Sequence, residues 1–309
     1  MILTVTLNAA IDQTYRLDRL YAGEVNRVAR VIPSAGGKGL NVARVVRSLG
    51  AEVRATGVLG GRNGDRIRDL LEQEHIPNDF FDAPIESRIC INIIDGDGTS
   101  TELLEPGDEV DKRTVEGFIG HFKELLKDAR VVTLSGSGLR GMPDNMYALL
   151  AGAAHEAGKP VILDSSGRWL TEGLKAAPTV IKPNRDELVQ LAGMELDEPG
   201  VVRFCQNYIR AGIRHAVVSL GSEGAILVSR EGSYHARPPK LSTVNTVGSG
   251  DAMVAGLAVG LMNGSAPEEL LRRAVAVSAA NTLTEQTGFV VEEEAGRLYQ
   301  EIRVERLGH

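Results

Sequence analysis

The sequence predicts an α/β fold in which a mostly parallel central sheet carries helices on both faces, with a small β-sheet beside it. Short apolar runs alternate with helical patterns between residues 114 and 228, which is typical of parallel strands joined by crossover helices. Two separated patches, at about 13–32 and 87–105, alternate apolar and polar residues and predict the small sheet. The glycine content, 35 of 309 residues, is well above the usual share of about 7% and indicates loops that approach a ligand closely.

The first hundred residues contain two kinds of strand. Residues 2–7 and 53–58 are continuous apolar runs, which predict buried strands. Residues 14–32 are expected to form a hairpin-like pair, and residues 89–94 and 99–104 flank the turn sequence from Asp95 to Gly98. We expect these two pairs to form one small sheet that stands off the main body, with helices up to residue 49 and at 65–74.

The rest of the chain alternates strands and helices. Strands are expected at 131–134, 161–163, 180–181, 216–220 and 225–228. Helices are expected at 114–127, 143–157, 201–211, 250–263, 267–285 and 292–301, with shorter ones after Arg168 and Asn184. Pro143 suits the first position of its helix. The chain is long enough for one large α/β domain or two domains.

Composition excludes several classes of partner. Lys and Arg total 34 against 41 Asp and Glu, a net charge of −7, so no general attraction to nucleic acid or to an anionic membrane is expected. The longest apolar run, 252–262, is shorter than the roughly 20 residues that span a bilayer. Cys90 and Cys205 are far apart, which argues against a disulfide framework and favours the cytoplasm. The six His show no metal-ligand spacing.

A glycine-rich loop precedes the apolar run at 252–262. Gly248 and Gly250 flank Ser249, so backbone N–H groups can converge on an anion at the positive end of a helix. Asp251 follows in the first turn and places a proton acceptor beside this anion site. Together these residues could transfer a phosphoryl group to a hydroxyl. The alternative is a glycine-rich turn with an Asp near its helix start.

A second glycine-rich loop near the N-terminus also precedes a helix. Gly36, Gly37, Lys38, Gly39 and Asn41 suggest a site for an anion or a polyol at the helix start. The loop is not a P-loop, because the Walker spacing and the Ser or Thr after Lys are missing. Its glycines could instead only allow tight helix packing. Asp12 follows the first strand, where it could bind a ligand or simply form a turn.

Two further motifs leave alternatives open. Gly136, Gly138 and Gly141 match the dinucleotide fingerprint of an oxidoreductase, but Pro143 follows closely, whereas the third glycine of that motif lies inside its helix. Asn184 and Glu187 lie three residues apart at a predicted helix start. They could converge on a ligand or form a capping box.

With both glycine motifs in this order and separation, the chain resembles the phosphofructokinase-B group of ribokinase-like sugar kinases. The similarity extends over nearly the whole chain, including 182–187 and 219–224. Within the group, residues 1–8, 26–27, 88, 101–107 and 286–290 are most similar to tagatose-6-phosphate kinases, with the 1-phosphofructokinases close behind. The resemblance implies one ribokinase-like domain over 1–309, a lid formed by about 13–32 and 87–105, and a homodimer through that lid.

The resemblance also implies the reaction and the roles of its residues. ATP, with Mg²⁺, would phosphorylate a ketohexose monophosphate to the bisphosphate, either tagatose 6-phosphate or, alternatively, fructose 1-phosphate. Asp251 would accept the hydroxyl proton, and the N–H groups of Gly248, Ser249 and Gly250 would stabilise the transferring phosphoryl group. The sugar phosphate would be bound by Asp12, Arg27, Gly37, Lys38, Asn41, Arg88 and Arg140. The nucleotide would be bound by Lys182, Asn184, Glu187, Ser219, Gly221 and Gly224, with Asn184 and Glu187 organising Mg²⁺ through water.

The sequence departs from the group's pattern at three places. Ala9 replaces a Pro, Ser87 replaces a Thr, and Gly138 with Leu139 replaces Leu-Pro after Ser137. The third change predicts a looser loop near the substrate. A non-catalytic sugar-phosphate sensor is a further alternative, and Asp251 and Glu187 argue against it.

Overall fold

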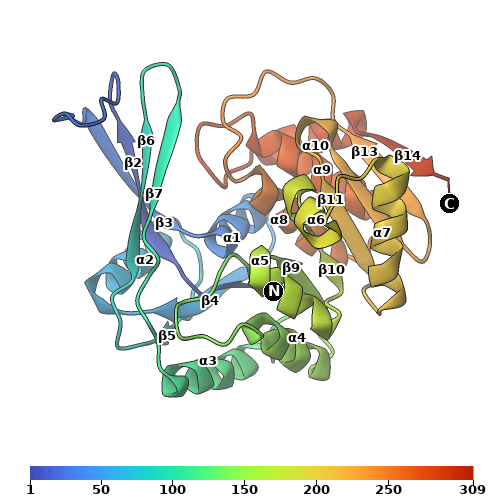
Figure 1. The fold of residues 1–309 in the computed structure, drawn as a ribbon, viewed down its shortest axis with the longest axis horizontal. Helices are drawn as coiled ribbons and strands as arrows, with labels where there is room; N and C mark the ends of the chain where they lie inside the picture. The colour runs from blue at the N-terminus through green and yellow to red at the C-terminus, as the bar shows by residue number, and fades with distance from the viewer. Residues whose placement is uncertain (309) are drawn as a thin grey trace.

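The large sheet holds ten strands in a computed structural model that describes residues 1–308 (Figure 1). Their order across the sheet is β14 (Arg303–Leu307), β13 (Ser233–Arg237), β12 (Ala225–Ser229), β11 (His215–Ser219), β10 (Val180–Ile181), β9 (Val161–Asp164), β8 (Val131–Ser135), β1 (Ile2–Thr6), β4 (Val53–Leu59) and β5 (Phe81–Asp82). Neighbours are parallel from β5 to β11 and antiparallel from β11 to β14. The predicted mostly parallel sheet is therefore confirmed.

Strand β1 lies between β4 and β8 and is buried along its whole length. Side chains on a strand point alternately to opposite faces, and β1 accordingly contributes to both cores. Ile2 packs in the hydrophobic cluster on one face, whereas Leu3 and Val5 pack in the cluster on the other face. A continuous apolar run is what a strand covered on both sides requires.

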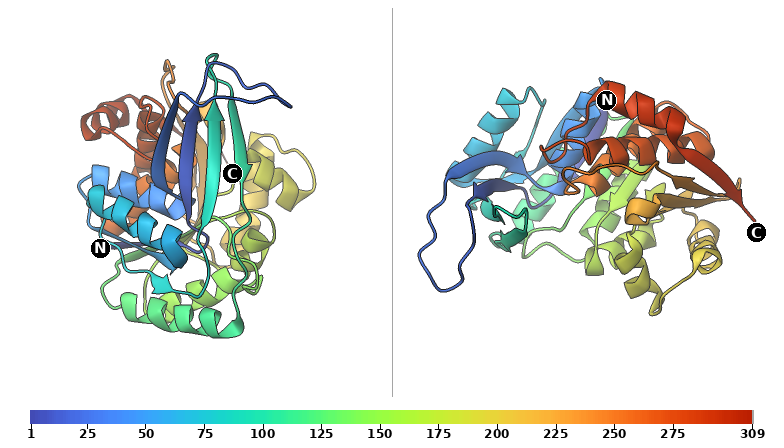
Figure 2. Two further views of the ribbon diagram at one scale, coloured as in Figure 1. Left: turned by 90° about the vertical axis from the view of Figure 1, so that its left-hand side faces the viewer. Right: turned by 90° about the horizontal axis from the view of Figure 1, so that it is seen from above.

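Helices cover both faces of the large sheet, as predicted (Figures 1 and 2). One face carries α1 (Lys38–Ser48), α2 (Gly61–Gln73), α8 (Ser249–Met262), α9 (Pro267–Asn281) and α10 (Glu292–Glu301). The other face carries α3 (Lys112–Leu125), α4 (Met146–Glu156), α5 (Gly167–Gly173), α6 (Arg185–Ala192) and α7 (Glu198–Arg210). Two short 3₁₀ helices, η1 (Leu174–Ala176) and η2 (Gly221–Glu223), complete the description. Among residues 1–308, no helix is both long and apolar enough to cross a lipid bilayer.

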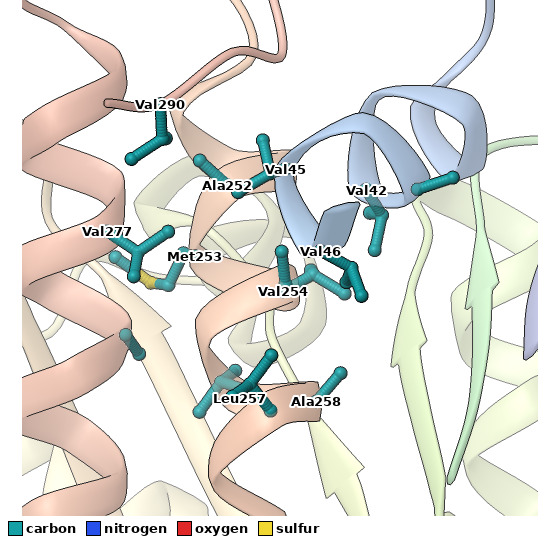
Figure 3. Packing of buried hydrophobic residues seen from close by; sticks show 14 of the residues in the cluster. Val42, Val45, Val46, Ala252, Met253, Val254, Leu257, Ala258, Val277 and Val290 are labelled. Carbon is teal, nitrogen blue, oxygen red and sulfur yellow. The ribbon is translucent and has the colours of Figure 1, made fainter. Parts of the chain in front are cut away.

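Helix α8 is apolar on all sides because other elements surround it. Val42 and Val46 of α1 face Val254 and Ala258 of α8 (Figure 3), and α9 packs along another side. A Cβ atom at Gly256 would lie 2.9 Å from the Cα atom of Ala274 on α9. The backbones of α8 and α9 thus approach as closely as they do because this position has no side chain.

The small sheet stands off the main body, with its four strands side by side in the left view of Figure 2. Their order is β3 (Arg30–Gly36), β2 (Ala10–Arg16), β6 (Arg88–Ile94) and β7 (Ser100–Leu104). β2 runs parallel to β6, and the two outer pairs are antiparallel. The prediction that the two patches form one separate sheet is confirmed.

Strands in the first patch differ from the prediction for a physical reason. β2 ends at Arg16 and β3 begins at Arg30, so Val25 and Val28 lie in the connecting loop. Asp12 accordingly lies within β2, opposite Ser34, and not in a turn after β1. The partner that defines β2, strand β6, is about 80 residues away in the chain, and local alternation of residues carries no signal of such pairing.

Other boundaries differ as well. Helix α4 begins at Met146, and Pro143 lies in the turn before it. The carbonyl of Pro143 accepts a hydrogen bond of 2.9 Å from the N–H of Met146. Helix α9 ends at Asn281 rather than at residue 285. Strands β5, β13 and β14 were not predicted. β5 has only two residues, too few to show a pattern. β14 is a partly exposed edge strand, and its charged residues leave no alternation of apolar and polar residues long enough to recognise.

The close packing at Gly256 leads to a stability prediction. Gly256→Ala should lower the free energy of unfolding by about 1–2 kcal/mol, because overpacking against backbone atoms costs more than the helix propensity gained. Gly152→Ala is the matched control on α4, where a Cβ atom meets nothing within 4 Å. That change should stabilise the protein by about 0.5–1 kcal/mol. Urea unfolding measures both, and equal effects of the two substitutions would contradict the packing argument.

Candidate active site

Two cavities meet at the edge of the large sheet where its parallel strands end. The smaller cavity, about 540 Å³, lies between the small sheet and the first turns of α1 and α8. The larger cavity, about 900 Å³, lies beside η2, α8 and α9. Lys38 and Gly250 line both cavities, and Asp251 lines the smaller one at this junction. Two ligands bound in these cavities would therefore meet beside Asp251.

Most of the residues predicted from the sequence divide between the two cavities. The smaller cavity is lined by Asp12, Gly37, Lys38, Asn41, Arg88, Gly248, Gly250 and Asp251. The larger cavity is lined by Lys38, Lys182, Asn184, Glu187, Ser219, Gly221, Gly224, Ser249 and Gly250. Arg27 and Arg140 line neither cavity. Arg27 is exposed on the loop between β2 and β3, and Arg140 is exposed with its Nε atom donating to the carbonyl of Gly107.

Asp251 is a buried carboxylate in the first turn of α8. Its Oδ2 atom accepts a hydrogen bond of 2.8 Å from Nδ2 of Asn41. Burial raises the pKa of Asp251 to about 6, and the Lys38 ammonium and the Asn41 hydrogen bond limit that rise. Asp251 is therefore ionised at neutral pH while it is only weakly solvated, which suits a proton acceptor.

The loop before α8 forms a tight anion cradle. Gly248 has a φ of 82°, and a Cβ atom there would lie 3.0 Å from the backbone N of Gly288, so both conformation and space require glycine. The carbonyls of Val247 and Ser249 accept hydrogen bonds from Asn281 and Ser278 of α9. These bonds hold the loop. The N–H of Ser249 donates to the carbonyl of Thr246 at 3.3 Å, whereas the next N–H groups of the first turn, those of Gly250 and Asp251, have no intrahelical partner and can bind an anion.

Asp164 at the end of β9 lies between two ammonium groups. Lys182 Nζ is 3.1 Å from Asp164 Oδ1, and Lys38 Nζ is 3.6 Å from Oδ2. Burial acts to raise the pKa of Asp164, but Lys182 and Lys38 outweigh it and hold that pKa below its usual value. Sequence reasoning missed Asp164, because the predicted strand ended one residue earlier. A polar residue at the carboxyl end of a parallel strand, the signal applied to Asp12, would have identified it.

Asn184 and Glu187 form the capping box that the sequence left as an alternative. Asn184 Oδ1 accepts the N–H of Glu187 at 2.7 Å, and Glu187 Oε2 accepts the N–H of Asn184 at 2.9 Å. Both residues nevertheless line the larger cavity. In the described chain, 1–308, no group of three or more His, Cys, Asp or Glu side chains could hold a metal ion. The donor set fits a hydrated Mg²⁺ held by one carboxylate oxygen and ligand phosphates, the mode this ion commonly adopts.

Asp12 and Arg88 enter the smaller cavity from the small sheet. Burial raises the pKa of Asp12 to about 6, with Arg44 and Arg88 acting in the opposite direction. A Cβ atom at Gly36 would lie 2.1 Å from Asp12 Cγ, so the glycine leaves room for this carboxylate. Arg88 donates to the carbonyl of Glu105 at 2.7 Å and to the carbonyl of Asn8 at 3.2 Å. These bonds fix a cation at the cavity wall.

The loop after β8 is firmly packed, so the prediction of a looser loop is wrong. A Cβ atom at Gly138 would lie 2.5 Å from the Trp169 ring, and Leu139 is buried. Gly141 lies in a turn before α4, outside the helix, unlike the third glycine of a dinucleotide motif. Gly136 and Ser137 line the smaller cavity.

The raised pKa of Asp251 leads to a pH-dependent prediction. An Asp with an unfolded pKa of about 3.9 and a folded pKa of about 6 binds its proton more tightly in the folded state. Its ionisation therefore costs stability progressively as the pH rises from about 4 to about 6, and the cost is constant above that range. Relative to wild type, the free energy of unfolding of Asp251→Asn should rise by on the order of 3 kcal/mol across this window.

Urea unfolding at pH 4, 5, 6 and 8 measures this difference. Asp69→Asn, an exposed residue on α2, controls for the loss of one negative charge. A stability difference between Asp251→Asn and wild type that stays constant from pH 4 to pH 8 would contradict the burial argument.

Comparison with known proteins agrees with this geometry. The pfkB family carbohydrate kinase model matches residues 5–294. A Staphylococcus aureus protein considered to be a phosphofructokinase is 30% identical, with 99% of each chain covered and a TM-score of 0.86. Phosphofructokinase-2 from Escherichia coli in complex with fructose-6-phosphate is 28% identical, with 97% and 98% covered and a TM-score of 0.88. A possible 1-phosphofructokinase from Thermotoga maritima is 26% identical over the full length of both chains, with a TM-score of 0.84. The chain therefore belongs to the pfkB family of carbohydrate kinases and is a sugar kinase that transfers a phosphoryl group.

Proposed function

We propose that the protein transfers the terminal phosphoryl group of ATP to a ketohexose monophosphate and forms the bisphosphate. The observation that carries this proposal is the junction of two cavities at Lys38 and Gly250, directly beside Asp251. The smaller cavity suits a sugar phosphate, because Arg88 offers a cation while Asp12 and Asn41 offer hydrogen-bonding groups for hydroxyls. The larger cavity has the size for a nucleotide and holds Lys182 and the start of α6.

In the proposed reaction, Asp251 accepts the proton of the attacking sugar hydroxyl. The hydroxyl oxygen forms a bond to the terminal phosphorus while the bond from that phosphorus to the bridging oxygen breaks, and ADP leaves with the electron pair. The N–H groups at the start of α8 stabilise the negative charge on the transferring group. Lys38, which lines both cavities, adds positive charge at the same place. Ser219, Gly221 and Gly224, which line the larger cavity, would contact the nucleotide.

We propose that Glu187, with ATP, holds a hydrated Mg²⁺ in the larger cavity. Bound there, the ion would neutralise charge on the phosphates. One carboxylate oxygen of Glu187 caps α6, which leaves the other for a water ligand. Asn184 then acts mainly by fixing the helix start through its own capping bond.

Tagatose 6-phosphate is the first substrate candidate and fructose 1-phosphate the second. Support for the first comes from the resemblance at residues 101–107 and 286–290. Thr287 of the second segment lines the smaller cavity, as do Glu102 and Leu104 of the first. The Escherichia coli relative bound to fructose-6-phosphate and the Thermotoga relative support a phosphorylated ketohexose as the substrate class.

We propose that the small sheet acts as a lid on a single domain and pairs with the lid of a second copy. Leu103 is exposed on β7 and Val25 is exposed on the β2–β3 loop, and the outer strands β3 and β7 have unpaired edges. Packing against an identical sheet would bury the exposed apolar side chains and pair the free strand edges. Arg27 lies on the β2–β3 loop, so its predicted role needs that loop to reach a cavity, its own or that of the second copy. Sedimentation equilibrium tests the dimer.

A panel of acceptors distinguishes the substrates. ADP release should be fastest with tagatose 6-phosphate, lower with fructose 1-phosphate, and lowest with fructose 6-phosphate and unphosphorylated sugars. Asp251→Asn should lose turnover by several orders of magnitude yet still bind the sugar phosphate, because only the proton acceptor is removed. Turnover limited to unphosphorylated sugars would overturn the substrate class, and near wild-type turnover by Asp251→Asn would remove Asp251 as the base.

Arg88 should determine affinity for the sugar phosphate. Arg88→Ala should raise KM for the sugar phosphate about 10- to 100-fold, since a hydrogen bond to a charged group contributes about 1.5–3 kcal/mol. KM for ATP should stay near wild type, because Arg88 does not line the larger cavity. Arg113→Ala, an exposed change on α3, is the charge control. An unchanged sugar-phosphate KM in Arg88→Ala would move the phosphate site elsewhere.

A further inference from the structure

A continuous chain of hydrogen bonds connects Asp251 to the far end of α2. Asn41 donates its Nδ2 hydrogen to Asp251 Oδ2 at 2.8 Å. Arg44, one turn further along α1, donates from Nη1 to Asn41 Oδ1 at 2.9 Å. The Nε atom of Arg44 lies 2.6 Å from Glu74 Oε2 at the end of α2, and its other terminal nitrogen donates to the carbonyl of Ala35. Arg44 is only 6% exposed.

This chain determines which end of the Asn41 amide faces Asp251. An asparagine side chain carries an acceptor oxygen and a donor nitrogen, whereas an arginine offers donors only. Because Arg44 donates to Asn41, the amide oxygen must face Arg44 and the amide nitrogen must face Asp251. The reversed amide would direct its oxygen at the Asp251 carboxylate, and two acceptors would repel each other. Arg44 thus removes the unproductive orientation.

The geometry of Arg44 is specific to a guanidinium. Its planar fork reaches three acceptors from three segments, namely Asn41 on the same helix, Glu74 and the Ala35 carbonyl. A lysine has the same charge but a single nitrogen on a flexible chain, and cannot satisfy three acceptors in fixed directions. The Glu74 carboxylate neutralises this buried cation and restricts its position.

The charges around Asp251 come from several elements. Lys38 of α1, Asp164 at the end of β9 and Lys182 after β10 all act on its carboxylate. The Asn41 hydrogen bond is among the interactions that favour the ionised form of Asp251. It also engages Oδ2, and so leaves Oδ1 to accept a proton from a ligand hydroxyl. Arg44 itself faces the carboxylates of Glu74 and Asp12.

We propose that Arg44, held by Glu74, is a positioning residue that orients Asp251 for proton transfer through Asn41. The proposal rests on the proposed role of Asp251 as the catalytic base. Arg44 contributes through the geometry of its hydrogen bonds. A Lys at this position would keep the positive charge near Asp12 and Glu74 but would lack the planar guanidinium group.

The test compares Arg44→Lys with Arg47→Lys, the matched control on the same helix. Arg47 is exposed in the last turn of α1. Arg44→Lys should lower kcat on the order of tenfold, which corresponds to the loss of about one oriented hydrogen bond. The acid limb of its kcat profile should move to higher pH, since an Asp251 that loses the Asn41 bond has a higher pKa. KM for ATP should stay near wild type, and Arg47→Lys should match wild type throughout.

A double variant tests the route through Asn41. In an Asn41→Ala background, adding Arg44→Lys should shift the pH profile no further, because the connecting amide is already absent. A full additional shift would overturn the proposal, as would an unchanged kcat profile in folded Arg44→Lys. If Arg44→Lys fails to fold, Glu74→Gln provides the same measurement, with a smaller shift in the same direction expected and no shift overturning the proposal.

Failure of the proposed function gives a different result. If Asp251→Asn keeps wild-type turnover, Asp251 is not the base, and the proposed reaction mechanism is wrong whatever Arg44 does. If Asp251→Asn loses turnover while Arg44→Lys keeps the wild-type pH profile, the base stands and the positioning role of Arg44 is wrong.

Discussion

The site depends on one buried carboxylate, Asp164, placed between the ammonium groups of Lys38 and Lys182. Lys38 begins α1, Asp164 ends β9 and Lys182 follows β10, so three separate segments converge on one charge. Without Asp164, the two cations would repel each other, and the buried ammonium group of Lys182 would have no carboxylate partner. With it, both can remain where phosphates of a nucleotide would approach. The pair of Asp164 and Lys182 is almost fully buried, and such a pair contributes more to geometry than to net stability.

Local sequence patterns were sufficient for most of the fold and for the two glycine-rich loops, whereas the family resemblance was needed to assign Arg88, Lys182, Ser219, Gly221 and Gly224 to the site. Continuous apolar strands, amphipathic helices and glycine-rich loops each depend on neighbouring residues, and parallel strands then bring their loops to one edge. Asp164 was missed because a two- or three-residue apolar run does not define where a strand ends. Arg44 was missed because a single Arg in an amphipathic helix usually faces solvent. Its burial depends on Glu74, thirty residues further along the chain.

The glycines of the N-terminal loop serve both purposes that the sequence left open. A Cβ atom at Gly39 would lie 2.3 Å from Thr6 Oγ1 on β1, and one at Gly37 would lie 2.7 Å from Thr6 Cγ2. The start of α1 therefore rests directly on the central strand. This tight packing is also what brings Lys38 and Asn41 to the sheet edge beside Asp251. Because Gly37 and Gly39 have no side chains, α1 can pack closely on β1, and the same close packing positions the ligand-binding residues.

The small sheet joins the body of the protein through four chain crossings, and Arg88 ties three of them together. Its guanidinium bonds the carbonyls of Asn8, before β2, and Glu105, after β7, while Arg88 itself begins β6. Asn8 in turn donates to the carbonyl of Pro106. Any rotation of the sheet relative to the body must strain these bonds together. An anion that binds Arg88 would compete with these bonds. Binding in the smaller cavity would thus be coupled to the angle between the small sheet and the body.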